Sequence, residues 1–455
     1  MTDASLHPDA SGRSSLHEKD ARTQRRNRSE ARFKTLGIGA VGLGMAFVVI
    51  LLGAILFNGM SAFQQSFIDV PVYLDPAKLD KKGNRDPEDL KKVSTFGYAP
   101  LIDKGLAKAA AEAGIAQELT GKDVKNLTSA SAASQVRDTV LAKPELIGET
   151  VSFRILASSR VDGYLKGRVT RESVAEDKNI SPAELDLTDA LVEAGIVVKA
   201  FNMAFITGAD ASESRAEQAG IGVSMIGSFM MMLVVLLLSL PIGVAASIYL
   251  EEFAPKNRLT DLIEVNIANL AAVPSIVFGI LGLAVFIQFG GGTLGITGLK
   301  ASAPLVGGLV LTLMTLPTII ISTRAALKAV PPSIRDAALG IGASKMQSIF
   351  HHVLPLAMPG ILTGTIIGLA QALGETAPLL LIGMVGYIAT NYPDGLQSAL
   401  IDPNSAMPAQ IYEWAKRADP AYYERAWGGI IILLVFLLGM NLIAILLRRR
   451  FERRW

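Results

Sequence analysis

The chain contains no cysteine among its 455 residues. That absence excludes disulfide bonds, thiolate metal ligands and a thiol nucleophile. Histidine is almost as scarce, and the four residues, His7, His17, His351 and His352, lack the spacing of a zinc site. We therefore expect no metal site, no cofactor and no catalytic residue that depends on either group.

Charged residues are also few, at 18% of the chain, whereas hydrophobic residues make up 50%. A soluble domain usually has about 25% charged residues. Several apolar runs reach about 20 residues, which is enough to span a bilayer as a helix. We predict an α-helical polytopic membrane protein with six transmembrane helices, at 36–57, 222–249, 263–288, 304–323, 357–384 and 428–447.

Nucleotide-binding signatures are missing as well. No segment matches the phosphate-binding loop G-x-x-x-x-G-K-[ST]. Gly37 to Gly42 fits G-x-G-x-x-G, but that fingerprint needs a preceding strand, and here a basic tail precedes it and an apolar run contains it. Small residues in a membrane helix favour close helix packing instead. The chain therefore has no recognisable nucleotide site of its own.

Two segments outside the apolar runs differ in character. Residues 1–35 are polar and basic, and their composition predicts a largely disordered tail. Residues 58–218 are rich in charge, with helix-like periodicity at 103–115 and 187–196 and strand-like segments at 151–156 and 197–206. They predict an inserted α+β domain without a catalytic constellation.

The distribution of Lys and Arg predicts the orientation in the membrane. Cytoplasmic loops carry an excess of these residues. Placing the N-terminus in the cytoplasm puts the basic tail, loops 251–262 and 324–356, and the basic C-terminus 448–455 on the same side. The domain at 58–218 then lies outside, which means the periplasm in a bacterium. We expect a multi-pass protein of the inner membrane with both termini in the cytoplasm.

The loop at 324–356 is a polar insert between two apolar runs. Pro331-Pro332 ends the preceding helix, and Ser333 with Asp336 resembles a capping box. Ser344 with Gln347 forms a second capping box, after a break at Gly340 and Gly342, and Pro355 is expected to end that helix. The pattern predicts a helix–turn–helix with an apolar surface from Ala337, Ala338, Leu339 and Ile341. A plain connector on the membrane surface is the alternative.

The segment DAALGIGASKMQSIFHHVLP, from Asp336 to Pro355, resembles the EAA loop of ABC importer permeases, E-A-A-x3-G-x9-I-x-L-P. Asp336 stands for the usual Glu and His352 for the usual aliphatic residue. The resemblance implies a coupling helix that docks on a cytoplasmic ATPase, so that ATP hydrolysis takes place on a separate chain and this chain is no enzyme. The matching residues are Asp336, Ala337, Ala338, Gly342, Leu354 and Pro355.

Further segments resemble phosphate permease subunits of the PstA type, over roughly residues 220–447. They are 272–282, 316–320, 326–331 and 372–378. The resemblance implies a five-helix permease core at 220–447 and an importer for inorganic phosphate. Its partners would be two ATPase copies, a second permease subunit of the PstC type, a periplasmic phosphate-binding protein and membrane lipid, with no nucleic acid. The basic tail, the first span and the domain at 58–218 look like the N-terminal extension that some PstA proteins carry. That domain could dock the binding protein, contact the partner permease or regulate access.

Glu375 is an ionisable residue inside an expected span. Counted from Pro359 it lies roughly 24 Å along a helix, and such a residue is costly unless it meets a partner or a water-filled path. It therefore predicts a translocation pathway that includes Gln371, Glu375 and Thr376. A structural hydrogen bond between helices is the alternative.

A carboxylate alone repels phosphate, so a cation should compensate Glu375. In the family an Arg commonly stands four residues earlier, where this chain has Gln371. Arg324 lies near the cytoplasmic end of its span, too far away to serve. We expect the charge to come from a second permease subunit, or Glu375 to be protonated at rest.

Two rival functions remain open from the sequence. The same architecture could carry another oxyanion or small solute. A membrane sensor would also combine spans with an external domain, but it needs a cytoplasmic signalling domain, and the longest internal segments have only about 35 residues.

Overall fold

The structure is a computed structural model that describes residues 21–115, 124–174, 179–212, 215–386 and 389–451. The chain divides into two compact units, Met1–Phe57 and Asn58–Trp455. Within these described residues, six helices are long and apolar enough to cross a membrane: Arg22–Phe63, Gly222–Phe253, Ser275–Thr293, Pro304–Lys328, Lys345–Gly374 and Pro420–Arg450. This number confirms the predicted six spans, and the mostly helical fold class is confirmed with it.

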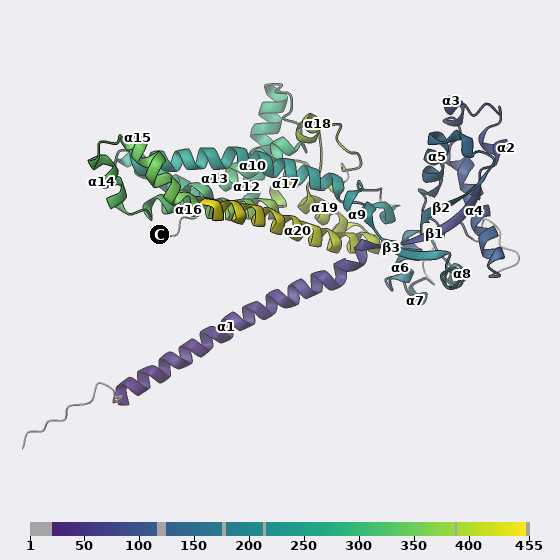
Figure 1. Cartoon of the computed structure of the whole chain (residues 1–455), viewed down its shortest axis with the longest axis horizontal. Coiled ribbons are helices and arrows are strands. Elements are labelled where there is room, and N and C mark those ends of the chain that lie inside the picture. Colours follow the sequence, from purple (N-terminus) through teal and green to yellow (C-terminus); the bar gives the residue numbers. More distant parts are fainter. Residues whose placement is uncertain (1–20, 116–123, 175–178, 213–214, 387–388, 452–455) are drawn as a thin grey trace, which may run out of the picture. The chain divides into compact units, whose positions relative to one another are not determined.

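Helix α1 runs from Ala21 to Gly59 and is longer than the apolar run at 36–57 (Figure 1). Arg, Lys, Glu and Ala are good helix formers, so the basic stretch before the apolar run continues the same helix. The prediction of disorder is therefore wrong for residues 21–35. Residues 1–20 lie outside the described part of the chain.

The core of the second unit is built around three long helices, α10 (Gly222–Ile248), α13 (Pro304–Lys328) and α16 (Leu354–Gly374). Small residues let them approach closely: a Cβ at Gly243 would meet Ile319, and one at Gly308 would meet Val234. Helix α20 (Pro420–Phe451) packs on α16 and on α19 (Met407–Lys416).

Two predicted spans are broken where the sequence places proline. The block at 263–288 divides into α11 (Arg258–Ala271) and α12 (Ser275–Gly282), separated at Pro274, and a π-helical stretch η5 (Leu283–Thr293) follows α12. The block at 357–384 divides into α16 and α17 (Ala377–Leu381). Pro378 has no N–H to continue the hydrogen-bond ladder of α16, so the helix ends before it.

The α+β domain carries a three-stranded antiparallel sheet in the order β2-β1-β3. The strands are β1 (Gln64–Tyr73), β2 (Thr150–Leu156) and β3 (Val197–Phe201). Ile68, Val70 and Val72 of the central strand are fully buried in the domain core. The helix-like and strand-like segments are found, but the strand predicted at 197–206 ends at Phe201 and β1 was not predicted.

Helices α4 (Thr95–Glu112), α5 (Ala132–Ala142), α6 (Ser159–Leu165) and α8 (Pro182–Glu193) contact the strands of this sheet. The short helices α2 (Pro76–Leu79), α3 (Pro87–Leu90) and α7 (Arg171–Val174) belong to the same domain, and α9 (Met203–Thr207) contacts α10. The remaining short elements are η1 (Met60–Phe63), η2 (Pro144–Leu146), η3 (Ala216–Gln218), η4 (Tyr249–Phe253), α14 (Pro332–Gly340), α15 (Lys345–Ser348), η6 (Ile349–Val353) and α18 (Leu396–Ile401).

Candidate functional site

The EAA-like loop (residues 324–356) has a helix–turn–helix shape. Helix α14 is followed by a turn in which Gly342 adopts φ +93°, a conformation that other residues rarely adopt. The Ser344 hydroxyl then accepts from the Gln347 N–H at 3.2 Å, and the Ser344 N–H donates to Gln347 Oε1 at 2.9 Å. The second predicted capping box is therefore confirmed.

Two other predictions about this loop are wrong. Helix α14 begins at Pro332, and no side chain caps it, so Ser333 and Asp336 form no capping box. Proline suits a first helical position because the N–H there needs no partner. Pro355 does not end a helix either. It lies in the first turn of α16, and the π-helical turn η6 joins α15 to α16 in one span.

Arg335 anchors α14 to the rest of the core. Its guanidinium donates to Glu252 Oε1 at 2.8 and 3.0 Å, and to the carbonyl oxygens of Leu327 at 2.9 Å and Val330 at 2.8 Å. The Glu252 side chain is 8% exposed. The ion pair of Arg335 and Glu252 was not predicted from the sequence. Two adjacent acidic residues after the span 222–249, together with basic residues in the loop 324–356, could have indicated it.

A second charge cluster lies beside it. Arg324 contacts Glu264 at 2.7 Å and Glu251 at 3.5 Å, and Lys328 also contacts Glu251 at 3.5 Å. These pairs join the end of α13 to η4, which follows α10, and to α11. Since Arg324 is engaged by two carboxylates, its charge is not free to compensate Glu375.

The inner side of the loop packs into an apolar cluster. Ile349 and Val353 are buried there, together with Leu327 and Val330 of the preceding segment. Ala338 of α14 is also buried, at 5% exposure. The prediction that Ala338 belongs to the apolar outer surface is therefore wrong. A packed interior of this kind fixes the orientation of α14.

The outer side of the loop exposes four large apolar side chains, here called the apolar face. They are Leu339, Ile341, Met346 and Phe350. Ile341 is the most exposed, at 85%, and Asp336 and Ala337 are exposed as well. Several large apolar side chains exposed on an otherwise polar loop are typical of a protein interface.

The structure places Glu375 at a break between two helices. Helix α16 ends at Gly374, and Glu375 has extended backbone with φ −76° and ψ 127°. Gln371 is exposed, whereas Glu375 and Thr376 are half-buried. Within the described part of the chain, no hydrogen bond or ion pair to the Glu375 carboxylate is found. We predicted Glu375 inside a continuous span, and this prediction is wrong. Glu375 lies directly after the end of α16.

A buried ion cluster joins the α+β domain to the start of α20. Lys166 contacts Asp162 at 2.7 Å and Glu424 at 2.9 Å, and Arg168 contacts the same two carboxylates at 3.1 and 2.5 Å. Three of the four side chains are at most 5% exposed. Arg425 is also buried, and donates to Gln65 Oε1 and to the carbonyl oxygen of Ala62. No local sequence pattern predicted this cluster, because Lys166 and Glu424 lie 258 positions apart.

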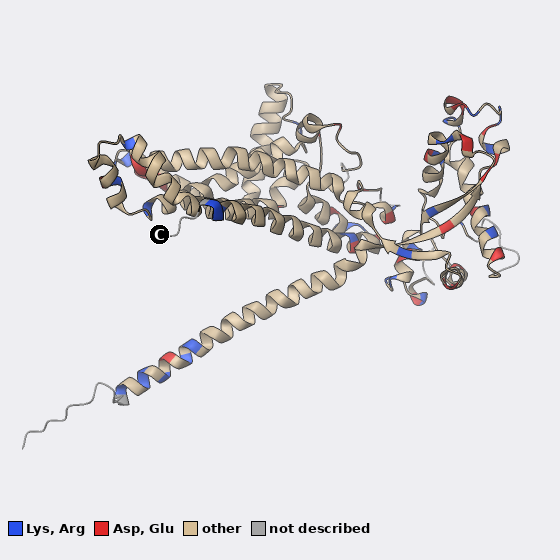
Figure 2. Cartoon of the chain, in the orientation of Figure 1, with Lys and Arg blue, Asp and Glu red and all other residues tan. Residues whose placement is uncertain are grey.

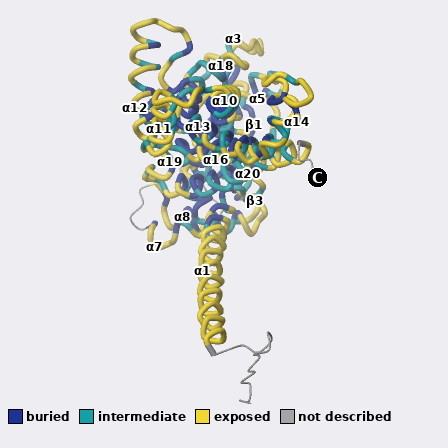
Figure 3. The backbone as a smooth tube through the Cα atoms, turned by 90° about the vertical axis from the view of Figure 1, so that its left-hand side faces the viewer, coloured by how far each residue is buried: buried dark blue, intermediate teal, exposed yellow. Residues whose placement is uncertain are grey.

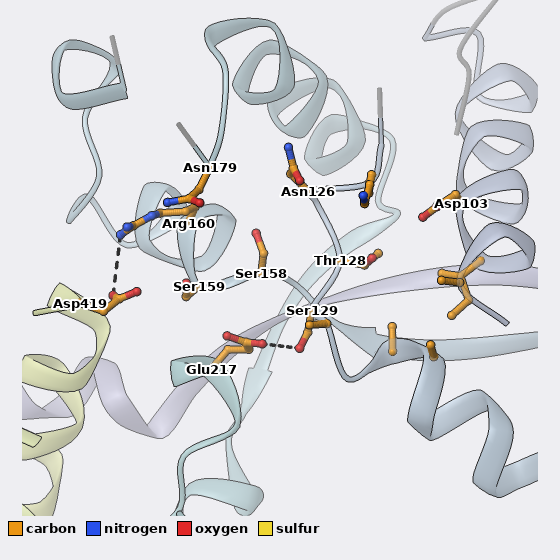
Figure 4. Close-up of a pocket in the computed structure, with 16 residues that line it drawn as sticks. Asp103, Asn126, Thr128, Ser129, Ser158, Ser159, Arg160, Asn179, Glu217 and Asp419 are labelled. Carbon is orange, nitrogen blue, oxygen red and sulfur yellow. Dashed lines mark hydrogen bonds and ion pairs between the residues drawn. The ribbon is translucent and has the colours of Figure 1, made fainter. Parts of the chain in front are cut away.

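A polar cavity of about 540 Å³ lies next to this junction (Figure 4). Arg160 and Asp419 pair across one end at 3.7 Å, and Asp103 lies at the other end. Burial raises the pKa of both Asp103 and Glu217. Because its carboxyl groups are not outnumbered by cations, the cavity is poorly suited to a multiply charged anion. No cluster of metal-ligating side chains occurs in the described ranges.

Comparison with known proteins decides the family. The family "Binding-protein-dependent transport system inner membrane component" matches residues 239–455. The phosphate transport system permease protein PstA of Mycobacterium leprae is 32% identical over 238 residues, covering 52% of this chain and 72% of that protein. The chain belongs to the binding-protein-dependent transport permease family.

The chain also resembles other proteins. The probable ABC transporter permease protein YqgI of Bacillus subtilis is 29% identical over 271 residues, covering 56% of this chain and 90% of that protein. A domain of unknown function, DUF3333, matches residues 20–175. The inward-facing MetNI methionine ABC transporter resembles the permease at 17% identity and a TM-score of 0.37, over 51% of this chain and 95% of that one.

This chain is accordingly a permease subunit of a binding-protein-dependent ABC importer. It is a multi-pass membrane component without ATPase activity of its own. Permeases of this family work with ATPase subunits and a periplasmic binding protein.

Proposed function

We propose that this permease subunit imports inorganic phosphate. Two observations support the substrate: the segments at 272–282, 316–320, 326–331 and 372–378 resemble PstA-type permeases, and the relative from Mycobacterium leprae is named as a phosphate transport permease. In this proposal a second permease of the PstC type, two ATPase copies and a periplasmic phosphate-binding protein complete the importer. The name of the Bacillus subtilis relative leaves its substrate open.

The proposed topology has both termini in the cytoplasm of a bacterium. The excess of Lys and Arg in residues 1–35, in the EAA-like loop and in residues 448–455 supports it. Span 36–57 would then deliver the domain at 58–218 to the periplasm, and the five-helix core at 220–447 would return the chain to the cytoplasm.

The apolar face of the EAA-like loop is the observation that carries the coupling role. Four exposed apolar side chains stand on a loop that Arg335 and a buried apolar cluster hold in place. A rigid loop of this kind can transmit movement of an ATPase to α13 and α16. We assign docking to Ile341 and its neighbours, with Gly342 shaping the turn and Leu354 and Pro355 starting the helix that receives the movement.

Co-purification of the ATPase tests this assignment. Ile341→Asp places a charge at the most exposed position of the apolar face, so we expect the ATPase to be lost from the purified complex. Ile296→Asp, at a 48% exposed position outside the loop, is the matched control and should retain it. An ATPase that stays bound to the Ile341 variant would contradict the docking role.

The proposed pathway passes the break between α16 and α17. Broken helices line substrate sites in many transporters because their ends offer unpaired backbone groups. Thr376 adds a hydroxyl there, and Gln371 stands one helical turn before Glu375. The charge that compensates Glu375 would come from the second permease subunit, or Glu375 would be protonated at rest.

Uptake of labelled phosphate in a strain that lacks the gene tests the substrate. Complementation with this chain and its partner subunits should restore uptake, and excess unlabelled phosphate should compete while sulfate and phosphonate should not. Competition by sulfate or phosphonate would replace phosphate with another oxyanion while leaving the permease assignment intact.

A further inference from the structure

The start of α1 is a strongly basic helix. Between Ala21 and Thr35 it carries one acid, Glu30, against six basic residues: Arg22, Arg25, Arg26, Arg28, Arg32 and Lys34 (Figure 2). Every residue from Arg22 to Gly53 is exposed (Figure 3). Nothing in the coupling or transport roles described above uses this segment.

The five arginines gather on one side of the helix. At about 100° per residue they fall within an arc of about 160°, here called the arginine arc: Arg22, Arg25, Arg26, Arg28 and Arg32. Glu30 and Lys34 lie outside it, Ser29 and Phe33 lie within it, and Asn27 lies opposite its centre. An uninterrupted helix therefore presents a side with five guanidinium groups, one exposed aromatic ring and no acidic residue.

An upright helix could not bring this arc to a membrane surface. Arg22 precedes Leu36, the start of the apolar run, by 14 positions, which is about 21 Å along a straight helix. Charges more than about 8 Å from a surface are largely screened at physiological salt. Only Arg32 and Lys34 would then lie close to lipid headgroups.

The junction between the basic and apolar halves of α1 combines two features that weaken a helix. Gly37 and Gly39 stand there, and a Cβ at either would meet no atom within 4 Å. Glycine lowers helix stability relative to alanine. In addition, the Thr35 hydroxyl donates to the Ala31 carbonyl oxygen at 2.8 Å, a contact that often bends helices.

We propose that α1 bends at Thr35–Gly39 so that the arginine arc binds anionic phospholipid headgroups. Clusters of four to eight basic residues beside a span bind acidic lipids by charge attraction, and guanidinium groups suit phosphate oxygens. An acidic protein surface is the other conceivable partner. The membrane is favoured because the span tethers the arc to it permanently, which makes its effective concentration high.

Single labels test the proposal in the full-length protein. Because the chain has no cysteine, Ser29→Cys and Asn27→Cys each create one site for a fluorescent probe, inside and opposite the arc. The protein is placed in nanodiscs of phosphatidylcholine alone or with about 30% phosphatidylglycerol. Quenching by a headgroup-attached spin label reports how close each probe lies to the headgroups.

We expect probe quenching at Ser29→Cys to exceed that at Asn27→Cys by about twofold or more in the anionic discs only. The excess should disappear at about 0.5 M salt, and in a variant that combines Arg25→Gln, Arg28→Gln and Arg32→Gln. Free inorganic phosphate should have no effect beyond that of equal ionic strength, because the arc binds lipid headgroups.

Alanine substitutions of the glycines test the proposed bend separately. Gly37→Ala with Gly39→Ala should stiffen the junction and reduce the excess quenching by about twofold, while Gly42→Ala with Gly44→Ala, deeper in the span, should leave it unchanged. Equal quenching in both kinds of disc, or quenching that survives the triple Arg substitution, would overturn lipid binding. Protection of Ser29→Cys only when the ATPase is present would overturn it in favour of a protein partner.

Discussion

Lys166 of the α+β domain and Glu424 at the start of α20 form an ion pair at 2.9 Å, although 258 positions separate them in the chain. Their side chains are only 5% and 3% exposed. Arg168 and Asp162 complete the charge balance around them. Two segments that no local pattern connects are therefore fixed to one another, and the domain is an integral part of the permease unit.

Neutralising Glu424 should destabilise this junction. Glu424→Gln leaves Lys166 and Arg168 with Asp162 alone, and breaking a buried pair costs about 3–5 kcal/mol. We expect a clear decrease in the melting temperature of the full-length protein. The pair of Lys416 and Glu413, whose side chains are 53% and 23% exposed, provides the more accessible control, since Glu413→Gln should cost less than about 1 kcal/mol.

A second substitution separates charge from packing at the same site. Lys166→Met combined with Glu424→Gln removes one charge of each sign, so the double variant should recover part of the stability that Glu424→Gln loses. Equal melting temperatures for the single variant and the Glu413→Gln control would show that the cluster contributes no stability.

The stability of the unit should fall as pH rises because of Glu217. Burial holds the pKa of this carboxyl above its ordinary value of 4.5, and a hydrogen bond from Ser129 offsets the rise only in part. Arg425, which also lowers it, and Asp419, which raises it, are the charged neighbours. The folded state therefore keeps a proton that the unfolded chain releases, and the free energy of unfolding decreases between pH 4.5 and the folded pKa.

Glu217→Gln tests this pH dependence because Gln resembles the protonated acid. Melting temperatures measured from about pH 5 to about pH 8 should decline less steeply in the variant than in the natural chain. Burial also raises the pKa of Asp103, so the melting temperature of the Glu217→Gln variant should still decrease with pH, but less steeply. Parallel curves for the two proteins would show that Glu217 does not titrate in this range.

The turn of the EAA-like loop should depend on Gly342. Gly342→Ala forces a side chain into φ +93°, which costs about 1–2 kcal/mol, with no steric clash because a Cβ there meets no atom within 4 Å. We expect weaker coupling of ATP hydrolysis to transport in the reconstituted importer. Gly340→Ala is the matched control, since Gly340 is also open but has no positive φ. Equal coupling in both variants would contradict a role for the turn.

Removing the Arg335 anchor should loosen α14. Arg335→Gln leaves the carboxylate of Glu252, which is 8% exposed, without its charged donor, at a cost of about 1.5–3 kcal/mol. ATPase activity stimulated by the binding protein should decrease severalfold, and Arg335→Lys should restore it only in part because Lys cannot donate to three acceptors in one plane. Arg258→Gln, at an exposed position, should change little.

Glu375→Gln should alter phosphate uptake if the break between α16 and α17 lines the pathway. The amide keeps the shape of the side chain but removes its charge, so a role that needs the carboxylate is lost while packing is kept. Initial uptake rates in the complemented deletion strain measure the effect. Unchanged transport would remove Glu375 from the pathway and leave it a structural role.

In the EAA-like loop, the sequence predicted only those features whose hydrogen bonds join residues close together in the chain. The capping box of Ser344 and Gln347 was predictable because both partners lie within one helical turn. Ser333 failed as a cap because Pro332 already begins the helix, and Pro355 failed as a stop because a π-helical turn precedes it. Where two neighbouring residues could each start or end a helix, the backbone geometry decides between them. The sequence pattern does not contain that geometry.

The α+β domain shows the same limit. Segments 103–115 and 187–196 have helical periodicity and are helical in large part. The central strand β1 was missed because Gln65, Ser66, Asp69 and Pro71 interrupt its apolar residues. Pairing with β2 and β3 on both sides makes it a strand, and those partners lie about 80 to 135 positions away, as in Val70 with Phe153 and Phe67 with Val198.

The sequence by itself determined the number of spans, the permease class and the place of the EAA-like loop, because apolar run length and short-range motifs are local properties of the chain. Only the tertiary structure decided that Ala338 faces inward, that Arg335 anchors α14, and that Glu375 stands at a helix end. It also decided that Lys166 meets Glu424. These features depend on which distant segments of the chain pack together. Whether a charge is buried, or Ile341 is exposed, follows only from that packing.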